Sequence, residues 1–132
     1  MGASEIKDDR NYTKDHEWAR VEGDEVVVGI TAFAVDQLGD VTLVALDVKP
    51  GDSVKAHQTF GTIESVKTLS DLFSPISGTV TRLNPALESQ PELINEDCWE
   101  KGWMIAIKPA ADPGAELLDA QSYRKVIESS QH

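Results

Sequence analysis

The sequence predicts a mainly β domain, a compact barrel or sandwich with a few short helices added. Its apolar runs are short, turn signals such as Pro50-Gly51-Asp52 separate them at regular intervals, and few stretches show helical periodicity. The 132 residues are enough for one domain and too few for two ordinary ones. A hydrophobic content of 40% and a charged content of 27% are those of an ordinary globular protein.

A hairpin and a short helix come first along the chain. The runs at 17–21 and 25–30 are separated by the turn signal Glu22-Gly23-Asp24, which predicts two paired antiparallel strands. Thr31 is a good N-cap and Gly39 is a stop signal. The apolar residues between them therefore predict a helix of about two turns.

Strands dominate the middle of the chain. Over 41–48, Val41, Leu43 and Ala45 alternate with their neighbours, which predicts a strand with these three residues on a buried face. Residues 84–95 begin with Asn-Pro and predict a helical or looped insertion. Further short strands are predicted at 53–55, 59–64, 69–73, 79–83 and 103–108.

The two ends of the chain differ in character. We expect residues 1–11 to be a polar lead-in and residues 12–132 to form the domain with a C-terminal helical extension. The lead-in is acidic and lacks an apolar run, so we expect neither a signal peptide nor a transit peptide. Asp119 is the expected N-cap of a helix over 120–129. The apolar stripe of that helix consists of Tyr123, Val126 and Ile127.

Charge and composition exclude several classes of function. The net charge is −11 and the pI is near 4.5, so we expect no binding to nucleic acid or to an anionic membrane. No apolar run approaches the roughly 18 residues of a membrane span. The same charge favours docking onto basic faces of partner proteins, although it is also explained by solubility alone. Cys98 is the only cysteine, which excludes an internal disulfide and fits a reducing compartment.

The most informative stretch is 61–71. Lys67 lies between the predicted strands 59–64 and 69–73, so it is expected at a hairpin tip, fully solvated. Most surface lysines only keep a protein soluble, so position alone does not assign a role.

Several segments, in this order and spacing, give the sequence a resemblance to the H protein family of the glycine cleavage system, from about residue 12 to residue 123. They are Tyr12-Thr13-Lys14-Asp15-His16-Glu17-Trp18, Val28-Gly29-Ile30-Thr31, Gln37-Leu38-Gly39-Asp40, Glu64-Ser65-Val66-Lys67, Ser74-Pro75-Ile76-Ser77-Gly78, Pro91-Glu92-Leu93-Ile94-Asn95 and Gly102-Trp103-Met104. The resemblance implies a barrel-sandwich hybrid of the lipoyl-domain type, with short helices that include a C-terminal one. It also implies lipoate attached covalently to Lys67.

The resemblance further implies a non-catalytic, monomeric carrier. Such a carrier takes an aminomethyl group from glycine decarboxylase to aminomethyltransferase, and passes reducing equivalents to dihydrolipoyl dehydrogenase. Glu64 matches the acidic position that the lipoylating enzyme reads. The protein would then be cytoplasmic in a bacterium and in the mitochondrial matrix of a eukaryote.

Elementary chemistry agrees with this role for Lys67. Only lysine supplies a primary amine on a long flexible stem, and such an amine is needed to form an amide with lipoic acid. Lysine and lipoyl chain together give a tether of about 14 Å. Tethering raises the effective concentration at each partner to roughly millimolar.

Two acidic residues are candidates for a cleft that shelters the loaded arm. Glu17 and Asp71 would bind the positively charged amine and slow its loss, although exposed carboxylates often contribute nothing measurable. No metal is expected at Asp15-His16-Glu17, because consecutive strand residues point to alternate faces. His16 and Trp18 are interpreted as packing residues. Cys98 is interpreted as a quiet thiol.

The chain departs from the usual pattern of the family at three places. His57 occupies a turn position where glycine is common, and would be strained if the turn needs a positive φ. Thr68-Leu69 replaces a usual Ala-Ala after the lysine, and the segment 98–101 replaces a commoner turn. These departures bear on efficiency and partner choice rather than on the attachment site.

Other functions stay open on the sequence alone. A biotin carrier would have Met on both sides of the lysine in place of Val66 and Thr68, and a lipoyl domain of a 2-oxoacid dehydrogenase would have Asp before it. A lipoyl relay that supplies other lipoate-dependent complexes has the same architecture. A hydrolase using Cys98 or His16 lacks a paired base and nucleophile. A non-catalytic acidic interaction module would not need Lys67.

Overall fold

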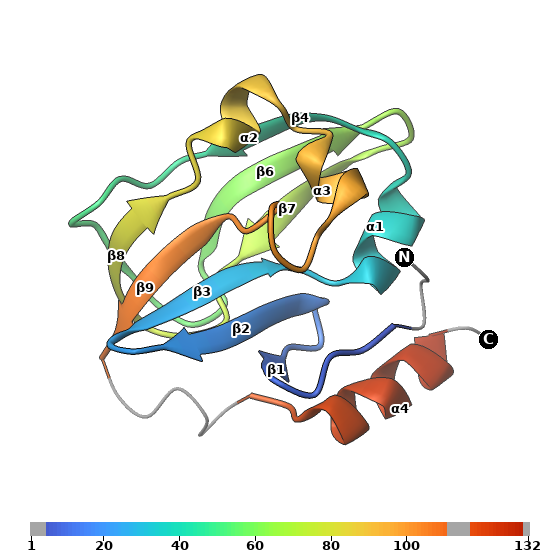
Figure 1. Cartoon of the computed structure of the whole chain (residues 1–132), viewed down its shortest axis with the longest axis horizontal. Coiled ribbons are helices and arrows are strands. Elements are labelled where there is room, and N and C mark those ends of the chain that lie inside the picture. The colour runs from blue at the N-terminus through green and yellow to red at the C-terminus, as the bar shows by residue number, and fades with distance from the viewer. Residues whose placement is uncertain (1–4, 111–116, 131–132) are drawn as a thin grey trace.

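Two antiparallel sheets form the protein in a computed structural model that describes residues 5–110 and 117–130 (Figure 1). The larger sheet has the strand order β1-β2-β3-β9-β8-β5 and the smaller one the order β4-β6-β7. The strands are β1 (Asn11–Tyr12), β2 (Glu17–Glu22), β3 (Glu25–Ile30), β4 (Val41–Leu46), β5 (Ser53–Val54), β6 (Thr59–Ser65), β7 (Leu69–Phe73), β8 (Gly78–Leu83) and β9 (Ile105–Pro109). The helices are α1 (Ala32–Leu38), α2 (Ala86–Ser89), α3 (Leu93–Glu96) and α4 (Ala120–Ser130). The predicted mainly β class with short helices is confirmed.

Local sequence explains the first hairpin and the first helix. Strands β2 and β3 pair antiparallel and the turn between them contains Gly23 with φ 60°, as a tight turn requires. The Thr31 side chain accepts a hydrogen bond from the backbone N–H of Ala34 at the start of α1. Gly39 ends the helix with φ 78°, and its N–H donates to the Val35 carbonyl. The predicted hairpin and capped helix are confirmed.

Strand β4 differs from its prediction. A bulge lies between Val41 and Leu43, so two residues of β4 oppose one of β6 and the alternation of faces shifts. As a result Val44 is buried in place of Leu43, which is 47% exposed. The expectation that Leu43 faces the core was wrong, because simple period-two alternation cannot register a bulge.

The residues just before the expected start of the domain carry structure. Strand β1 adds an edge to the larger sheet, and the Arg10 side chain is buried although it belongs to the expected lead-in. Its guanidinium lies 4.6 Å from the ring centroid of Trp18 and 5.3 Å from that of Trp99. It also donates a hydrogen bond to the Trp99 carbonyl at 2.9 Å and pairs with Asp9. The boundary at residue 12 itself stays a prediction.

Helix α4 docks beside β1 through its predicted apolar stripe (Figure 1). Tyr123 and Ile127 are buried, and the Tyr123 ring stacks on Tyr12 with centroids 4.6 Å apart. The Asp119 carboxylate accepts a 2.7 Å hydrogen bond from the Ser122 N–H, which confirms it as the cap of this helix.

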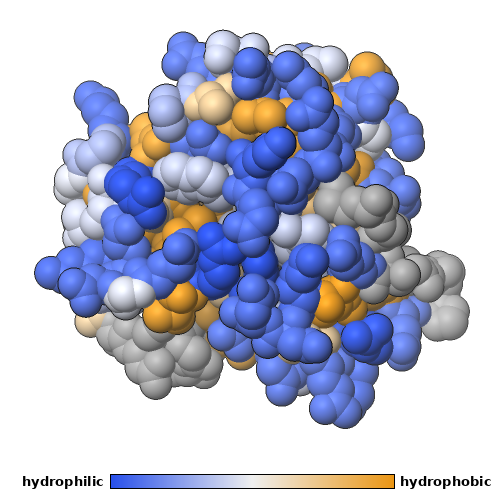
Figure 2. All heavy atoms as spheres, in the orientation of Figure 1, coloured by the Kyte–Doolittle hydropathy of each residue, from blue (hydrophilic) through white to orange (hydrophobic). Residues whose placement is uncertain are grey.

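The outer surface is largely hydrophilic. Figure 2 shows apolar residues only as separate islands on the face it presents, in keeping with a net charge of −11. No helix in the described ranges is long and apolar enough to cross a membrane. His57 adopts φ 71°, so the turn at this position does need a positive φ.

Candidate functional site

Lys67 lies in the loop that joins β6 to β7, as predicted. The loop is closed by Ser65, whose Oγ accepts hydrogen bonds from the backbone N–H groups of Lys67 and Thr68, both at 3.2 Å. The Ser65 N–H also donates to the Thr68 carbonyl at 2.8 Å. A serine hydroxyl at the first position of a tight turn is well placed for such bonds, and it fixes the backbone that carries Lys67.

A second set of bonds ties this loop to the rest of the domain. The Val66 N–H donates to the Asp40 carbonyl at 3.0 Å. The Asn95 side chain of α3 in turn donates to the Gly39 carbonyl at 2.9 Å and accepts from the Val41 N–H at 2.8 Å. Asn95 and Val66 therefore both bind the link between α1 and β4. The Val66 bond also fixes the β6–β7 loop against this link.

The Lys67 side chain is exposed and lies over Gly39. A Cβ added at Gly39 would be 3.2 Å from Lys67 Cε, so glycine leaves room for the stem as well as supplying the positive φ. Within the described ranges, Lys67 takes part in no ion pair. An amine that is neither buried nor paired is open to chemistry from solvent.

Glu64 lies three residues before Lys67 on β6. Its carboxylate is exposed on the outer face of the smaller sheet, and its backbone is paired with Leu43 of β4 and Leu69 of β7. This placement leaves it accessible to an enzyme that approaches the β6–β7 loop.

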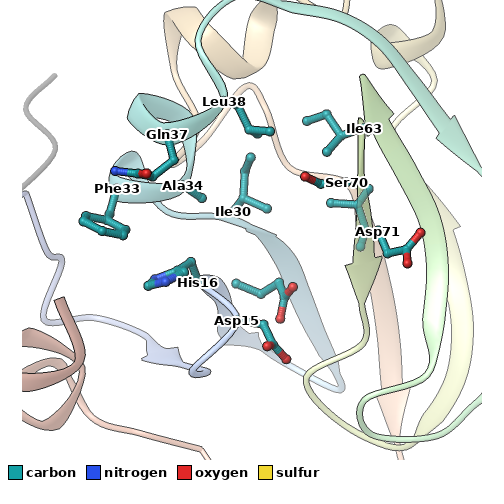
Figure 3. Close-up of a pocket in the computed structure, with 12 residues that line it drawn as sticks. Asp15, His16, Ile30, Phe33, Ala34, Gln37, Leu38, Ile63, Ser70 and Asp71 are labelled. Atoms are coloured by element: carbon teal, nitrogen blue, oxygen red, sulfur yellow. The ribbon is translucent and has the colours of Figure 1, made fainter. Parts of the chain in front are cut away.

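A pocket of about 380 Å³ opens between α1, β7 and the turn before β2 (Figure 3). Leu38, the last residue of α1, lines it, so the pocket begins next to Gly39 and the Lys67 stem. Its lining is Asp15, His16, Glu17, Ile30, Phe33, Ala34, Gln37, Leu38, Ile63, Ser70, Asp71 and Leu72.

Glu17 is the buried acid of this pocket, with only 2% of its surface exposed. Its Oε1 accepts a hydrogen bond from the Thr13 hydroxyl at 2.8 Å, and its Oε2 accepts one from the Phe73 N–H at 3.4 Å. Burial raises the pKa of Glu17 to about 8, and the negative charge of Asp15 adds to the rise. The carboxyl group is therefore mostly protonated near neutral pH.

The second cleft candidate, Asp71, lines the same pocket but at its rim. It is exposed, and Figure 3 shows its carboxylate on the side of β7 away from Leu38 while Ser70 points toward the cavity. Ser70 was missed by the sequence reasoning. The alternation of side chains along β7 could have distinguished Ser70 from Asp71. Ser70 shares a face of the strand with the apolar residue Leu72, which is buried, whereas Asp71 lies on the opposite face.

His16 packs against other residues, as interpreted. Its ring lies 4.7 Å from that of Phe33, and its Nδ1 is 2.7 Å from the Tyr123 hydroxyl, which also bonds Thr31 Oγ1 at 2.7 Å. Figure 3 shows the ring directed toward α4 rather than into the cavity. Burial lowers the pKa of His16. His16 thus joins α4 to the wall of the pocket.

Trp18 and Cys98 are both buried. The Trp18 indole N–H donates to the Cys98 carbonyl at 3.0 Å. Burial raises the pKa of the Cys98 thiol to about 12, which makes it a poor nucleophile. In the part of the chain that the structure describes, no group of three or more His, Cys, Asp or Glu residues is arranged to hold a metal ion.

Comparisons with known proteins agree with this geometry. The sequence profile of the family described as "Glycine cleavage H-protein" matches residues 10–130. The chain is 56% identical over 120 residues to the glycine cleavage system H protein of Magnetococcus marinus, covering 89% of this chain and 84% of that one. It is 51% identical over 117 residues to the H protein of Bacteroides thetaiotaomicron, covering 88% and 92%.

The fold agrees as well. The crystal structure of the glycine cleavage system H protein from Mycobacterium marinum superposes with a TM-score of 0.83 at 38% sequence identity, covering 96% of this chain and all of that one.

Two small antiparallel sheets with short helices, which superpose on an H protein of known structure, define a carrier domain of the lipoyl class. The chain belongs to the glycine cleavage H-protein family, as the matching profile and relatives show. It is a carrier subunit of the glycine cleavage system and not an enzyme in its own right. The family is one that carries lipoate, and its system name implies partner enzymes.

Proposed function

We propose that Lys67 is the residue that carries the lipoyl group. The main support for this proposal is that the Lys67 side chain is exposed and forms no ion pair with any described residue. It also lies on a loop whose backbone is fixed by hydrogen bonds to Ser65. In the attachment step the lone pair of Nζ attacks the carbonyl carbon of an acyl-adenylate. The C–N amide bond forms, AMP leaves with the electron pair of the broken C–O bond, and the amine gives up a proton.

The pocket is the proposed resting place of the arm, with Glu17 in its wall and Asp71 at its rim. The four residue steps from Lys67 to Asp71 would span about 13 Å if fully extended, and β7 begins only at Leu69, so the true distance is no greater. This lies within the about 14 Å of a lysine and lipoyl chain. A bound lipoyl group supplies a cyclic disulfide that can accept a one-carbon amine together with two electrons. Part of the wall is apolar, formed by Ile30, Phe33, Leu38, Ile63 and Leu72, and an arm lying against it would be shielded from water on that side.

Glu17 has the role of forming an ion pair with a positively charged amine that enters the pocket. At neutral pH its carboxyl group is mostly protonated because its pKa is about 8. A positive charge nearby favours the ionised form, so the incoming ammonium would lower this pKa and release the proton to solvent. The resulting ion pair is buried, where it is screened less than at the surface.

We infer that the partners are the lipoylating enzyme, which reads Glu64, then glycine decarboxylase, aminomethyltransferase and dihydrolipoyl dehydrogenase. The name of the family, which places the chain in the glycine cleavage system, supports the last three of these partners. The bacterial origin of the relatives reported above supports a cytoplasmic location.

Reconstitution of glycine cleavage tests the proposal. Lipoylated chain is combined with the three enzymes, glycine, tetrahydrofolate, pyridoxal phosphate and NAD, and NADH formation is followed. Wild type and Lys55→Arg, a matched change at another exposed lysine, are expected to be active, whereas Lys67→Arg is expected to be inactive. Equal activity of Lys67→Arg and Lys55→Arg would refute the assignment.

A further inference from the structure

The register of the smaller sheet aligns three exposed residues next to the β6–β7 loop. Leu43 of β4 pairs with Glu64 of β6, and Glu64 pairs with Leu69 of β7. Directly opposed residues of antiparallel strands point to the same face, so the three side chains form one row across the sheet. The adjacent row, with Ile63 and Val44, is buried, which fixes this one as outward-facing. We call it the Glu64 row.

The row holds two of the four large apolar side chains that are exposed among the described residues. Leu43 is 47% exposed and Leu69 is 65% exposed, and Val66 in the loop is 67% exposed. Among the described residues, Val21 is the only other large apolar side chain with comparable exposure. Apolar side chains gathered on one small surface are typical of a protein contact site.

Apart from Lys67, the charges in the segments that carry the row are negative. Asp71 follows Leu69 on the same face of β7, and Asp40 lies next to the loop, where its carbonyl accepts from Val66. Lys67 is the only Lys or Arg in the segments 36–48 and 59–73 that build this end of the molecule. A partner that covers the row therefore contacts both carboxylates and leucines. A cationic side chain with an aliphatic stem is complementary to this surface, because its stem packs on the leucines and its charge pairs with a carboxylate.

We propose that the Glu64 row is the docking surface for the lipoylating enzyme, and that it receives an Arg or Lys side chain of that enzyme. The stem of this side chain packs between Leu43 and Leu69 while its charged end pairs with the Glu64 carboxylate. The occupant is the lipoylating enzyme because an enzyme that encloses the Lys67 amine must also cover residues two and three positions away. This inference rests on the proposed function of Lys67 and adds the two leucines to the recognition of Glu64.

Steady-state lipoylation of the full unmodified chain tests it, using a lipoate–protein ligase with lipoic acid and ATP. Leu43→Thr and Leu69→Thr keep strand propensity and remove apolar contact, and Leu69→Ala is a second variant at that position. Each is expected to lower kcat/KM about tenfold through KM, with kcat unchanged. Val21→Thr, on the other sheet, is the matched control and is expected to react like wild type.

A double variant separates docking from general damage. Because the stem and the charge belong to one bound side chain, Leu43→Thr combined with Glu64→Gln is expected to lower kcat/KM by less than the product of the two single effects. Circular dichroism spectra and thermal midpoints equal to those of wild type would show that all variants are folded.

Two outcomes overturn the inference, and they are distinguishable. If Leu43→Thr and both Leu69 variants are lipoylated as fast as Val21→Thr, the row is not the docking surface although Lys67 is the attachment site. If wild type itself gains no lipoyl group on Lys67, the proposed function fails and the inference fails with it.

Discussion

Glu17 offers the sharpest test of the pocket's electrostatics, through the change Glu17→Gln. Burial raises the folded-state pKa from 4.5 to about 8, so the folded protein binds the proton more tightly than the unfolded chain. The stabilising contribution of the protonated form is fully present below pH 4.5 and is lost as the pH rises to 8. At about 1.4 kcal/mol for each pH unit between the two pKa values, the loss is about 5 kcal/mol.

Glutamine has nearly the same shape but does not titrate. It keeps one of the two hydrogen bonds, with Thr13 or with Phe73, and weakens the other, which costs about 1 kcal/mol. The variant is therefore expected to be about 1 kcal/mol less stable than wild type at pH 4.5. Above pH 8 it is expected to be several kcal/mol more stable, because it buries no charge.

Urea unfolding followed by tryptophan fluorescence, at steps between pH 4.5 and pH 9, measures the difference between the two proteins. Taking the difference cancels the titration of every group that the substitution does not affect. The two stability curves are expected to cross between pH 5 and pH 7. Parallel curves over the whole range would show that Glu17 is not held in its protonated form and would refute the reasoning.

Three further changes test the loop and its supports. Gly39→Ala is expected to cost about 1–2 kcal/mol, because φ is 78° and the new Cβ would approach the Lys67 stem; an unchanged urea midpoint would contradict this. Tyr123→Phe is expected to cost about 1–3 kcal/mol, since Thr31 and His16 both lose a partner; calorimetry measures it, and a wild-type Tm would count against it. Ser65→Ala is expected to speed amide hydrogen exchange at Lys67, unless the loop is held without the Ser65 hydroxyl.

Much of the fold was predictable because short-range chemistry determines it. Caps such as Thr31 and Asp119 and turn residues such as Gly23 act on their immediate neighbours, so the sequence alone shows where these helices and hairpins begin and end. The position of Lys67 at a loop tip followed in the same way from the two flanking strands.

What was not predictable depends on residues far apart in the chain. The bulge that exposes Leu43 is visible only in the pairing of β4 with β6. Arg10 is buried because Trp18 and Trp99 come together around it, and Glu17 is buried because α1 and β7 close over its strand. A charged residue in a polar sequence context gives no local sign of such burial.

Peptide mapping by mass spectrometry tests the central claim most directly. The chain is produced together with a lipoylating enzyme and lipoic acid, and its whole mass and proteolytic fragments are measured. One lipoyl increment is expected, on the fragment that contains Lys67. An unchanged whole mass, or an increment on any other lysine, would contradict the account.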